Sequence, residues 1–238
     1  MQIEVLKDAD AVASRASAII AEQARAAVAA RGRFLIAVSG GHTPWVMLRE
    51  LAKEQLPWEG VHVFQVDERI APAGDPERNL THLRESLLSH APIDPAHIYA
   101  MPVEKPDSDA AAAEYARTLE TLAGSPPVID LVHLGLGPDG HTASLIPNDP
   151  VLQVMHRDVA VAGVYQGRKR MTLTYGVIDR ARQILWVVTG EEKVKALSEL
   201  EKGNKSIPGG RIRRDGALVL ADEAAAGKRQ GNELTGLS

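Results

Sequence analysis

The chain has 238 residues, a formal net charge of −4 and no cysteine. Its hydrophobic content of 45% is typical of a globular protein rather than a disordered one, and its mild acidity argues against a general nucleic-acid binder, which carries a basic excess. The missing cysteines exclude disulfides, thiolate metal sites and a cysteine nucleophile. The N-terminal segment lacks the pattern of a signal peptide, and no apolar run approaches ~18 residues, so we expect a cytoplasmic protein without a membrane span.

Short apolar runs alternate with helix-period segments along the whole chain. The predicted strands are residues 3–6, 33–39, 61–68, 97–101, 128–137, 158–164, 170–175, 182–189 and 216–222. The predicted helices run from Asp8 or Asp10 to Ala30, from Thr43 to about Gln55, from Asn79 to Ser89, from Ser108 to Gly124 and from Gly190 to Lys202. This alternation is typical of an α/β protein with a mostly parallel sheet covered on both faces. No repeat or linker interrupts it, so we predict one domain over residues 1–223 and a loosely ordered tail over 224–238.

In such folds ligands bind beyond the carboxyl ends of the strands, and unusual residues follow three of the predicted strands. The first group is Ser39-Gly40-Gly41-His42-Thr43-Pro44. Paired glycines let backbone N–H groups approach a ligand closely, and the helix that Thr43 caps presents free N–H groups at its positive end. The segment therefore predicts a phosphate site, although a plain strand-to-helix turn has the same pattern.

The second group is Asp67-Glu68-Arg69, three charges at the end of an apolar strand. Buried charges need partners, so these residues are unsuited to a core and indicate a site. The alternative is the start of a solvated loop.

The third group is the loop Gly135-Leu136-Gly137-Pro138-Asp139-Gly140-His141. It contains a formal G-x-G-x-x-G pattern, but prolines within and after it leave no room for the helix that a dinucleotide site requires. The loop is instead expected to present Asp139 and His141 above the sheet.

Basic residues also occur where a helix does not favour them. Lys193 falls in the first turn of a predicted helix, where it opposes the helix dipole, and Arg170 begins a predicted strand after two further basic residues. Solvated surface charge is the ordinary explanation for such a run. Together with the glycine turn, these cations indicate a phosphorylated ligand.

These segments, in this order, resemble the bacterial 6-phosphogluconolactonases. The stretches concerned are SGGHTP (39–44), VDER (66–69) with DPERN (75–79), GLGPDGHTASLIP (135–147), KRMTLT (169–174) and GEEKVKAL (190–197). They span roughly residues 30–200, and GPDGHTASL is the most specific piece. The resemblance implies a Rossmann-like three-layer α/β/α sandwich. It also implies hydrolysis of 6-phospho-D-glucono-1,5-lactone, the second step of the oxidative pentose phosphate pathway.

The related isomerase/deaminase branch, which acts on amino-sugar phosphates, differs from this chain at two positions. It carries a ring-opening glutamate where this chain has Ile146, and a tyrosine where this chain has Arg69. Both departures favour the lactonase. Within the lactonase pattern, His42 stands where a small polar residue is more usual.

The implied reaction requires no metal and no cofactor, because water can attack the strained lactone directly. We expect His141 to take the proton from that water and to protonate the departing ring oxygen, while Asp139 or Asp67 orients the imidazole. The developing oxyanion would be met by backbone N–H groups near Gly40 and Gly41 or by Arg69.

The other end of the substrate carries a phosphate, which we expect Thr43 and its neighbouring N–H groups to bind. Arg170 and Lys193 would clamp it, the first with a planar fork and the second with a point charge. The expected partner is thus a small phosphorylated sugar lactone, not nucleic acid or a membrane. The sequence leaves the oligomeric state open, and a monomer is the working expectation.

Three other functions fit parts of the sequence. A serine hydrolase would use Ser39 in a strand-to-helix elbow, but the acid and histidine that follow come too early in the chain for the usual order. A non-catalytic sugar-phosphate sensor would need a DNA-binding module, for which we expect no room. An amino-sugar-phosphate isomerase/deaminase is disfavoured by Ile146.

Overall fold

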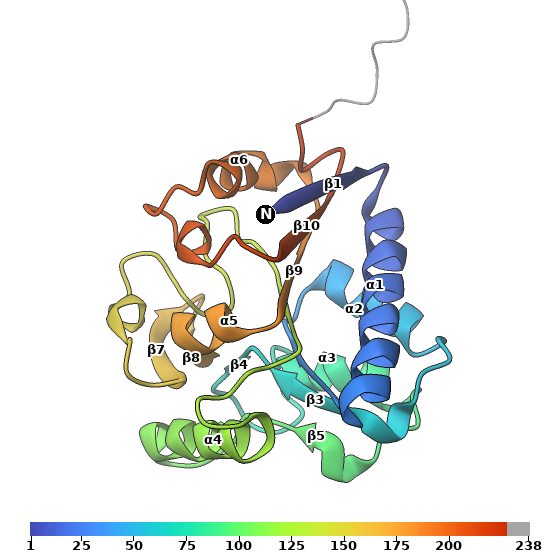
Figure 1. The fold of residues 1–238 in the computed structure, drawn as a ribbon. Helices are drawn as coiled ribbons and strands as arrows, with labels where there is room; N and C mark the ends of the chain where they lie inside the picture. Colours follow the sequence, from blue (N-terminus) through green and yellow to red (C-terminus); the bar gives the residue numbers. More distant parts are fainter. Residues whose placement is uncertain (228–238) are drawn as a thin grey trace, which may run out of the picture.

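The computed structural model describes residues 1–227 of the chain. Its main sheet has seven strands in the order β1-β10-β9-β6-β2-β3-β5, and every neighbouring pair is parallel (Figure 1). The strands are β1 Gln2–Leu6, β2 Phe34–Val38, β3 Val61–Gln65, β5 Ile98–Tyr99, β6 Leu131–Leu134, β9 Gln183–Val188 and β10 Ala217–Asp222. The predicted α/β class with a mostly parallel sheet is confirmed.

Helices cover both faces of this sheet (Figure 1). They are α1 Ala9–Arg31, α2 His42–Leu51, α3 Asn79–Leu83, α4 Ser108–Ala123, α5 Tyr175–Arg180 and α6 Val194–Lys202. Successive side chains of a strand point to opposite faces, and β2 shows this directly. Phe34, Ile36 and Val38 pack in the cluster with α1 and α2, whereas Leu35 and Ala37 pack in the cluster with α4 to α6. The three-layer arrangement is therefore confirmed.

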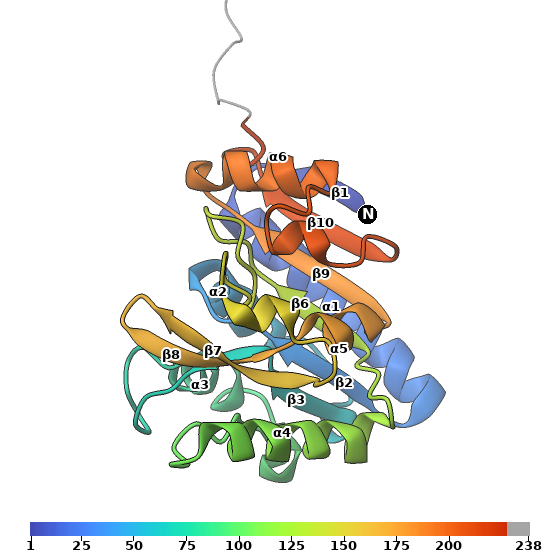
Figure 2. The ribbon, with the colours of Figure 1, turned by 90° about the vertical axis from the view of Figure 1, so that its left-hand side faces the viewer.

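A second sheet of three antiparallel strands, which the sequence analysis did not predict, lies on the α4 side. It consists of β4 Asp67–Arg69, β8 Arg168–Leu173 and β7 Val159–Tyr165, and Figure 2 shows the β7–β8 hairpin between α4 and α6. The single strand predicted over 61–68 is thus wrong. Val66 joins the two sheets, because its N–H donates to the Val38 carbonyl of β2 and its carbonyl accepts from Leu173 of β8.

The observed helix starts agree only in part with those predicted from the sequence. Asp8 caps α1 by accepting from the Ala11 N–H at 2.9 Å, and Gly32 ends α1 in the left-handed conformation at φ 73°. The capping residue of α2 is Gly41 rather than Thr43, which lies inside the helix. Lys193 ends a short 3-10 turn that precedes α6, so it stands one position before the helix in which it was predicted.

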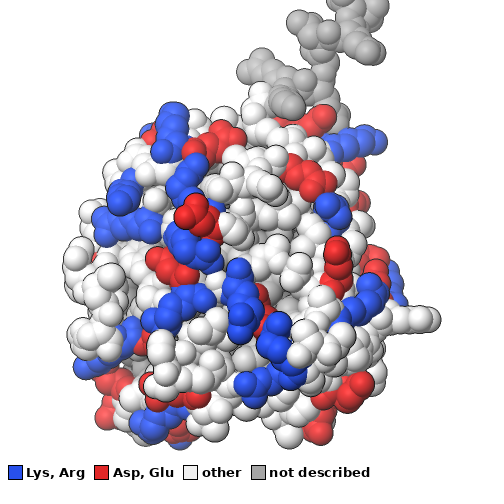
Figure 3. Space-filling view, in the orientation of Figure 1, with Lys and Arg blue, Asp and Glu red and all other residues white. Residues whose placement is uncertain are grey.

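The described chain continues past the last strand. Residues 224–227 form turns, and within them Ala225 is buried and donates its N–H to Asp222. The remainder of the predicted tail, residues 228–238, lies outside the described residues, and the single domain over 1–223 stays a prediction. No helix within residues 1–227 is long and apolar enough to cross a membrane. On the face shown in Figure 3, basic and acidic side chains lie side by side.

Candidate active site

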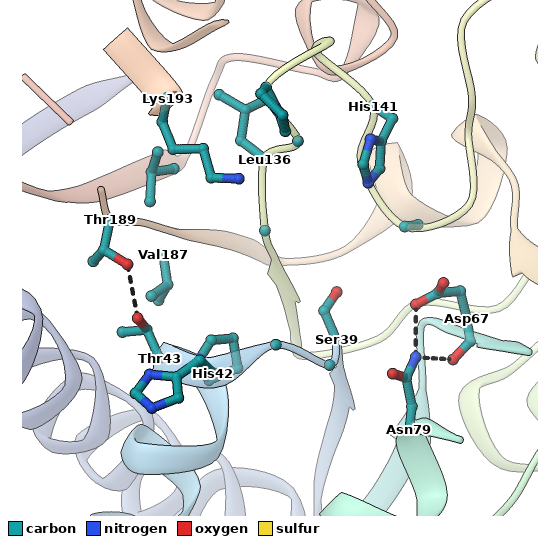
Figure 4. A pocket seen from close by; sticks show the side chains of 18 of the residues that line it. Ser39, His42, Thr43, Asp67, Asn79, Leu136, His141, Val187, Thr189 and Lys193 are labelled. Atoms are coloured by element: carbon teal, nitrogen blue, oxygen red, sulfur yellow. Dashed lines mark hydrogen bonds between the residues drawn. The ribbon is translucent and has the colours of Figure 1, made fainter. Parts of the chain in front are cut away.

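A pocket of about 390 Å³ opens at the carboxyl ends of β2, β6 and β9. This is where the order of the sheet reverses, because β3 and β5 extend from one side of β2 whereas β6, β9 and β10 extend from the other. Eight of the predicted site residues line it: Gly40, Gly41, Thr43, Asp67, Arg69, His141, Arg170 and Lys193. Figure 4 shows Lys193 and His141 on one side of the space, facing Thr43, Ser39 and Asp67.

The ninth predicted residue, Asp139, contacts His141. Its Oδ1 lies 2.6 Å from the imidazole Nδ1 and accepts the His141 backbone N–H at 3.1 Å. An ionised carboxylate only accepts hydrogen bonds, so Nδ1 is the nitrogen that carries the proton facing Asp139. In the neutral form of the ring, Nε2 then has a free lone pair. Burial raises the pKa of Asp139, but the hydrogen bonds and positive charge offered by His141, with a further bond from Tyr165, outweigh burial and lower it. Asp139 is therefore ionised and fixes the imidazole.

The glycines of this loop make room for that pair. A Cβ atom at Gly137 would lie 2.1 Å from Nδ1 of His141 and 2.8 Å from Oδ1 of Asp139. Gly140 adopts φ +81° with Ile207 packed against it, and it ties the loop by donating to the Gly137 carbonyl at 2.9 Å. The glycines of the pattern that resembles a dinucleotide motif thus provide the space that the His141 side chain occupies.

Asp67, the other carboxylate considered for orienting His141, is bonded elsewhere. Its Oδ2 accepts from the Ser144 hydroxyl at 2.6 Å, and Asn79 donates through Nδ2 to its carbonyl at 3.0 Å (Figure 4). Asn79 is buried, lines the pocket, and has an Oδ1 with no partner among the described residues. Sequence reasoning missed Asn79, although it ends the run DPERN after the charged strand end.

Glu68 faces away from the pocket. It is fully buried and accepts the backbone N–H groups of Arg69, Asn79 and Leu80, each at 2.8 Å. These bonds place a negative charge at the start of α3 and hold β4 against it. Neighbouring residues of a strand point to opposite faces, so Glu68 supports the site from behind while Asp67 and Arg69 face it.

The cations of the pocket form a concentrated positive group. Arg69 and Arg170 stand directly opposite each other in the β4–β8 pair, an arrangement of like charges that is unfavourable in the absence of an anion. The Nε of each is buried and without a partner among residues 1–227. Burial, and next the charge of Arg69, lower the pKa of Arg170. Such a pair is suited to an anion bound between or beside the two guanidinium groups.

The start of α2 provides a second electropositive edge. Its first N–H groups have no intrahelical partner and lie at the positive end of the helix. Thr43 shares a 2.7 Å hydrogen bond with Thr189, the residue after β9, and this bond ties the turn to the segment that carries Lys193. Lys193 also lines the pocket, with the carboxylate of Glu192 at 3.5 Å.

The structure argues against a serine nucleophile. The Ser39 hydroxyl donates to the His133 backbone carbonyl at 3.0 Å, and the Ser39 N–H donates to Nδ1 of the same histidine at 3.2 Å. His133 is fully buried, and that burial lowers its pKa to about 3. Among residues 1–227, Ser39 therefore has no basic partner that could take its proton. Within residues 1–227, no group of three or more histidine and carboxylate side chains is arranged to hold a metal ion.

Fold and pocket together define an α/β protein with a positively charged pocket at the carboxyl ends of its parallel strands, and comparison with known proteins gives the family. The chain belongs to the family described as glucosamine-6-phosphate isomerases/6-phosphogluconolactonase, whose profile matches residues 7–220. It is 37% identical to a 6-phosphogluconolactonase of Synechocystis sp., with 95% of this chain and 97% of that protein aligned. It is also 37% identical to a 6-phosphogluconolactonase of Mycobacterium tuberculosis, with 95% of this chain and 97% of that protein aligned.

Comparison with solved structures gives the same family. A 6-phosphogluconolactonase from Trypanosoma cruzi superposes with a TM-score of 0.85 at 26% identity, covering 97% of each chain. A monomeric glucosamine-6-phosphate deaminase superposes almost as well, with a TM-score of 0.84 at 19% identity over 96% of this chain and 100% of that one. The fold is therefore common to both branches of the family. The two sequence relatives named above are 6-phosphogluconolactonases, which are hydrolases, and this chain is an enzyme of that class.

Proposed function

We propose that this chain hydrolyses 6-phospho-D-glucono-1,5-lactone to 6-phospho-D-gluconate without a metal ion, using His141 as the base. The observation that carries the proposal is one pocket holding both parts the reaction needs. The imidazole fixed by Asp139 lies in it together with the cations Arg170 and Lys193. The names of the relatives support the same substrate.

The chemistry follows from the free Nε2 of His141. Water attacks C1 of the lactone and gives up a proton to Nε2, forming a tetrahedral oxyanion and an imidazolium that Asp139 stabilises. The oxyanion then collapses, the bond between C1 and the ring oxygen breaks, and the imidazolium protonates that oxygen. The product is an open-chain acid with a free hydroxyl, and the histidine is neutral again.

The substrate phosphate belongs at the positive edge of the pocket. We assign it to Arg170, Lys193 and the start of α2 around Thr43, since a dianion offsets the repulsion among these groups. Arg69 stands opposite Arg170, which favours the phosphate for it also. The N–H groups at Gly40 and Gly41 are then the donors for the oxyanion. An Arg69→Ala variant that loses kcat while keeping KM would move Arg69 to the oxyanion instead.

The alternatives within the family lack their key groups here. The deaminase branch was expected to need a glutamate at the position of Ile146, and this isoleucine is buried in the hydrophobic core. A sensor that only binds sugar phosphate has no use for a paired imidazole and carboxylate in its pocket. Assays with glucosamine 6-phosphate test the first alternative, and the turnover assay tests the second.

The deciding experiment compares the wild type with His141→Ala and His141→Asn. Acid release from freshly prepared lactone is followed with a pH indicator, and the spontaneous rate is subtracted. Loss of the base lowers kcat by about 10²–10⁴-fold. His156→Ala, which alters an exposed histidine outside the pocket, is the matched control and keeps full activity. Turnover by the His141 variants close to that of the wild type contradicts the proposal.

A further inference from the structure

Tyr165 ends strand β7 at the tip of the β7–β8 hairpin and lines the pocket. The two-residue turn that follows has Gln166 at φ 51° and Gly167 at φ 80°, the left-handed conformations that a tight hairpin needs. Register shifts between the pairs Ala162–Arg170 and Tyr165–Arg168, so β7 has one residue more than β8 there. This bulge brings Tyr165 onto the face of the hairpin that carries Arg170.

The Tyr165 hydroxyl contacts the catalytic pair. It donates to Oδ2 of Asp139 at 3.2 Å, the carboxylate oxygen that His141 Nδ1 does not use, and it lies 3.4 Å from that Nδ1. The two aromatic rings meet edge to face, with centroids 5.1 Å apart. Asp139 is thus held from one side by the imidazole and from the other by the phenol.

The face of the same ring contacts the cation assigned to the phosphate. The guanidinium carbon of Arg170 lies 5.0 Å from the Tyr165 ring centroid, a cation–π contact. Arg170 also donates to the Tyr165 carbonyl at 3.4 Å and to the Gln166 side chain at 3.3 Å. The hairpin tip therefore supports Arg170 with a ring, a carbonyl and an amide.

The charges around Tyr165 keep it a donor. Burial, and next the charge of Asp139, raise the pKa of its phenol, whereas Arg170 lowers it. The trio of Tyr165, Asp139 and His141 shares the pocket with further charged groups. These are Arg170 of β8, Asp67 and Arg69 of β4, and Glu192 and Lys193 before α6. A phenol that stays protonated at neutral pH cannot serve as a base, so its function is to hold its neighbours.

We propose that Tyr165 is a positioning residue that serves both halves of the pocket. Its hydroxyl fixes Asp139 and through it the His141 imidazole, and its ring fixes the guanidinium of Arg170. The inference rests on the proposed lactonase function and deepens it, because it links the base to the phosphate clamp through one side chain on the hairpin.

Two substitutions separate the two contacts. Tyr165→Phe removes the hydroxyl and keeps the ring, so kcat falls by about three- to tenfold while KM stays within about twofold. Tyr165→Leu removes both, so KM also rises by about threefold or more. Tyr99→Phe is the matched control, since it deletes a tyrosine hydroxyl bonded to a histidine outside the pocket, His62, at 3.0 Å. It leaves both constants unchanged.

The pH dependence gives a readout that a merely structural role does not move. Without the hydroxyl, Asp139 keeps more of its negative charge for the imidazolium, so His141 holds its proton to higher pH. The acid limb of kcat/KM shifts to higher pH in Tyr165→Phe. A proton NMR titration of His141 in the same variant shows the same upward shift without any turnover.

The outcomes distinguish this inference from the proposed function. If wild type and His141→Ala behave as expected but Tyr165→Phe matches the wild type in kcat and in the titration of His141, the positioning role is wrong and the function stands. A lower kcat with an unmoved titration also overturns the role. If the wild type does not hydrolyse the lactone, the function fails, and the NMR titration alone decides whether Tyr165 controls His141.

Discussion

Substituting Gly137 by alanine displaces the side chain of the proposed catalytic base, His141, but leaves the histidine itself in the sequence. The new Cβ atom would lie 2.1 Å from Nδ1 and 2.2 Å from Cε1 of His141. Ordinary contact begins at 3.4 Å, so the imidazole must retreat by about 1.3 Å. The colliding atoms belong to the ends of side chains, and Gly137 has no left-handed φ, so we expect the fold to survive.

A shift of that size is large compared with the tolerance of a reacting geometry. A misplacement of about 1 Å costs on the order of 10²-fold in rate, so kcat of Gly137→Ala falls to about one hundredth of the wild-type value. The phosphate clamp lies on other elements, so KM changes by less than about threefold. Steady-state kinetics over a range of lactone concentrations, with a thermal unfolding curve for each protein, measures both.

Gly135→Ala is the matched control in the same loop. A Cβ atom there meets no protein atom within 4 Å, and the residue has no left-handed φ, so the unfolding temperature matches the wild type. Gly135 lines the pocket, but its Cβ leaves the imidazole in place, so we expect kcat to stay within about threefold of the wild type. The reasoning is refuted if Gly137→Ala turns over as fast as Gly135→Ala. It is also refuted if both variants lose activity equally, because the loss then comes from the loop and not from the imidazole.

Other predictions concern the phosphate clamp and the buried histidine. Arg170→Ala and Lys193→Ala each raise KM for the lactone by about 10–100-fold with a smaller change in kcat, whereas Lys205→Ala, an exposed lysine outside the pocket, leaves KM unchanged; equal KM values in all three contradict the phosphate assignment. Unfolding lets His133, whose folded pKa is about 3, bind a proton below its ordinary pKa of 6.5, so the free energy of unfolding decreases as pH falls from 6.5 toward 3. The loss from this group at pH 5 relative to neutral pH is about 2 kcal/mol. His133→Asn keeps an acceptor for the Ser39 N–H and removes this dependence, which urea unfolding at several pH values measures; an unchanged slope shows that His133 is not the group responsible.

The sequence was sufficient for features that depend on neighbouring residues. Asp8 and Gly32 bound the first helix because a side-chain acceptor and a left-handed glycine act within one turn of it. Apolar strands alternating with helices predicted the parallel sheet. Parallel strands place their carboxyl ends at one edge, so the motifs around Gly41 and His141 were expected to share a pocket, and they do.

The tertiary structure decided which of these side chains touch. Asp67 and Asp139 each lie at the end of a predicted strand, and both were candidates for orienting His141. Only Asp139, which is close to His141 in the sequence, bonds to its imidazole, whereas Asp67 bonds to Ser144, 77 positions away. The run 61–68 reads as one apolar strand, but Val66 takes it from one sheet into another.

The contacts made by the second sheet are also decided by the tertiary structure. The pairing of Arg69 with Arg170, and the bulge that turns Tyr165 toward the pocket, are properties of antiparallel register. Register is fixed by how whole strands pack against the layer beneath them, and a shift of one residue reverses every side chain. The chain by itself therefore determined which chemical groups gather at the edge of the sheet. Packing between distant segments determined their partners, because each partner's position depends on burial that no local pattern records.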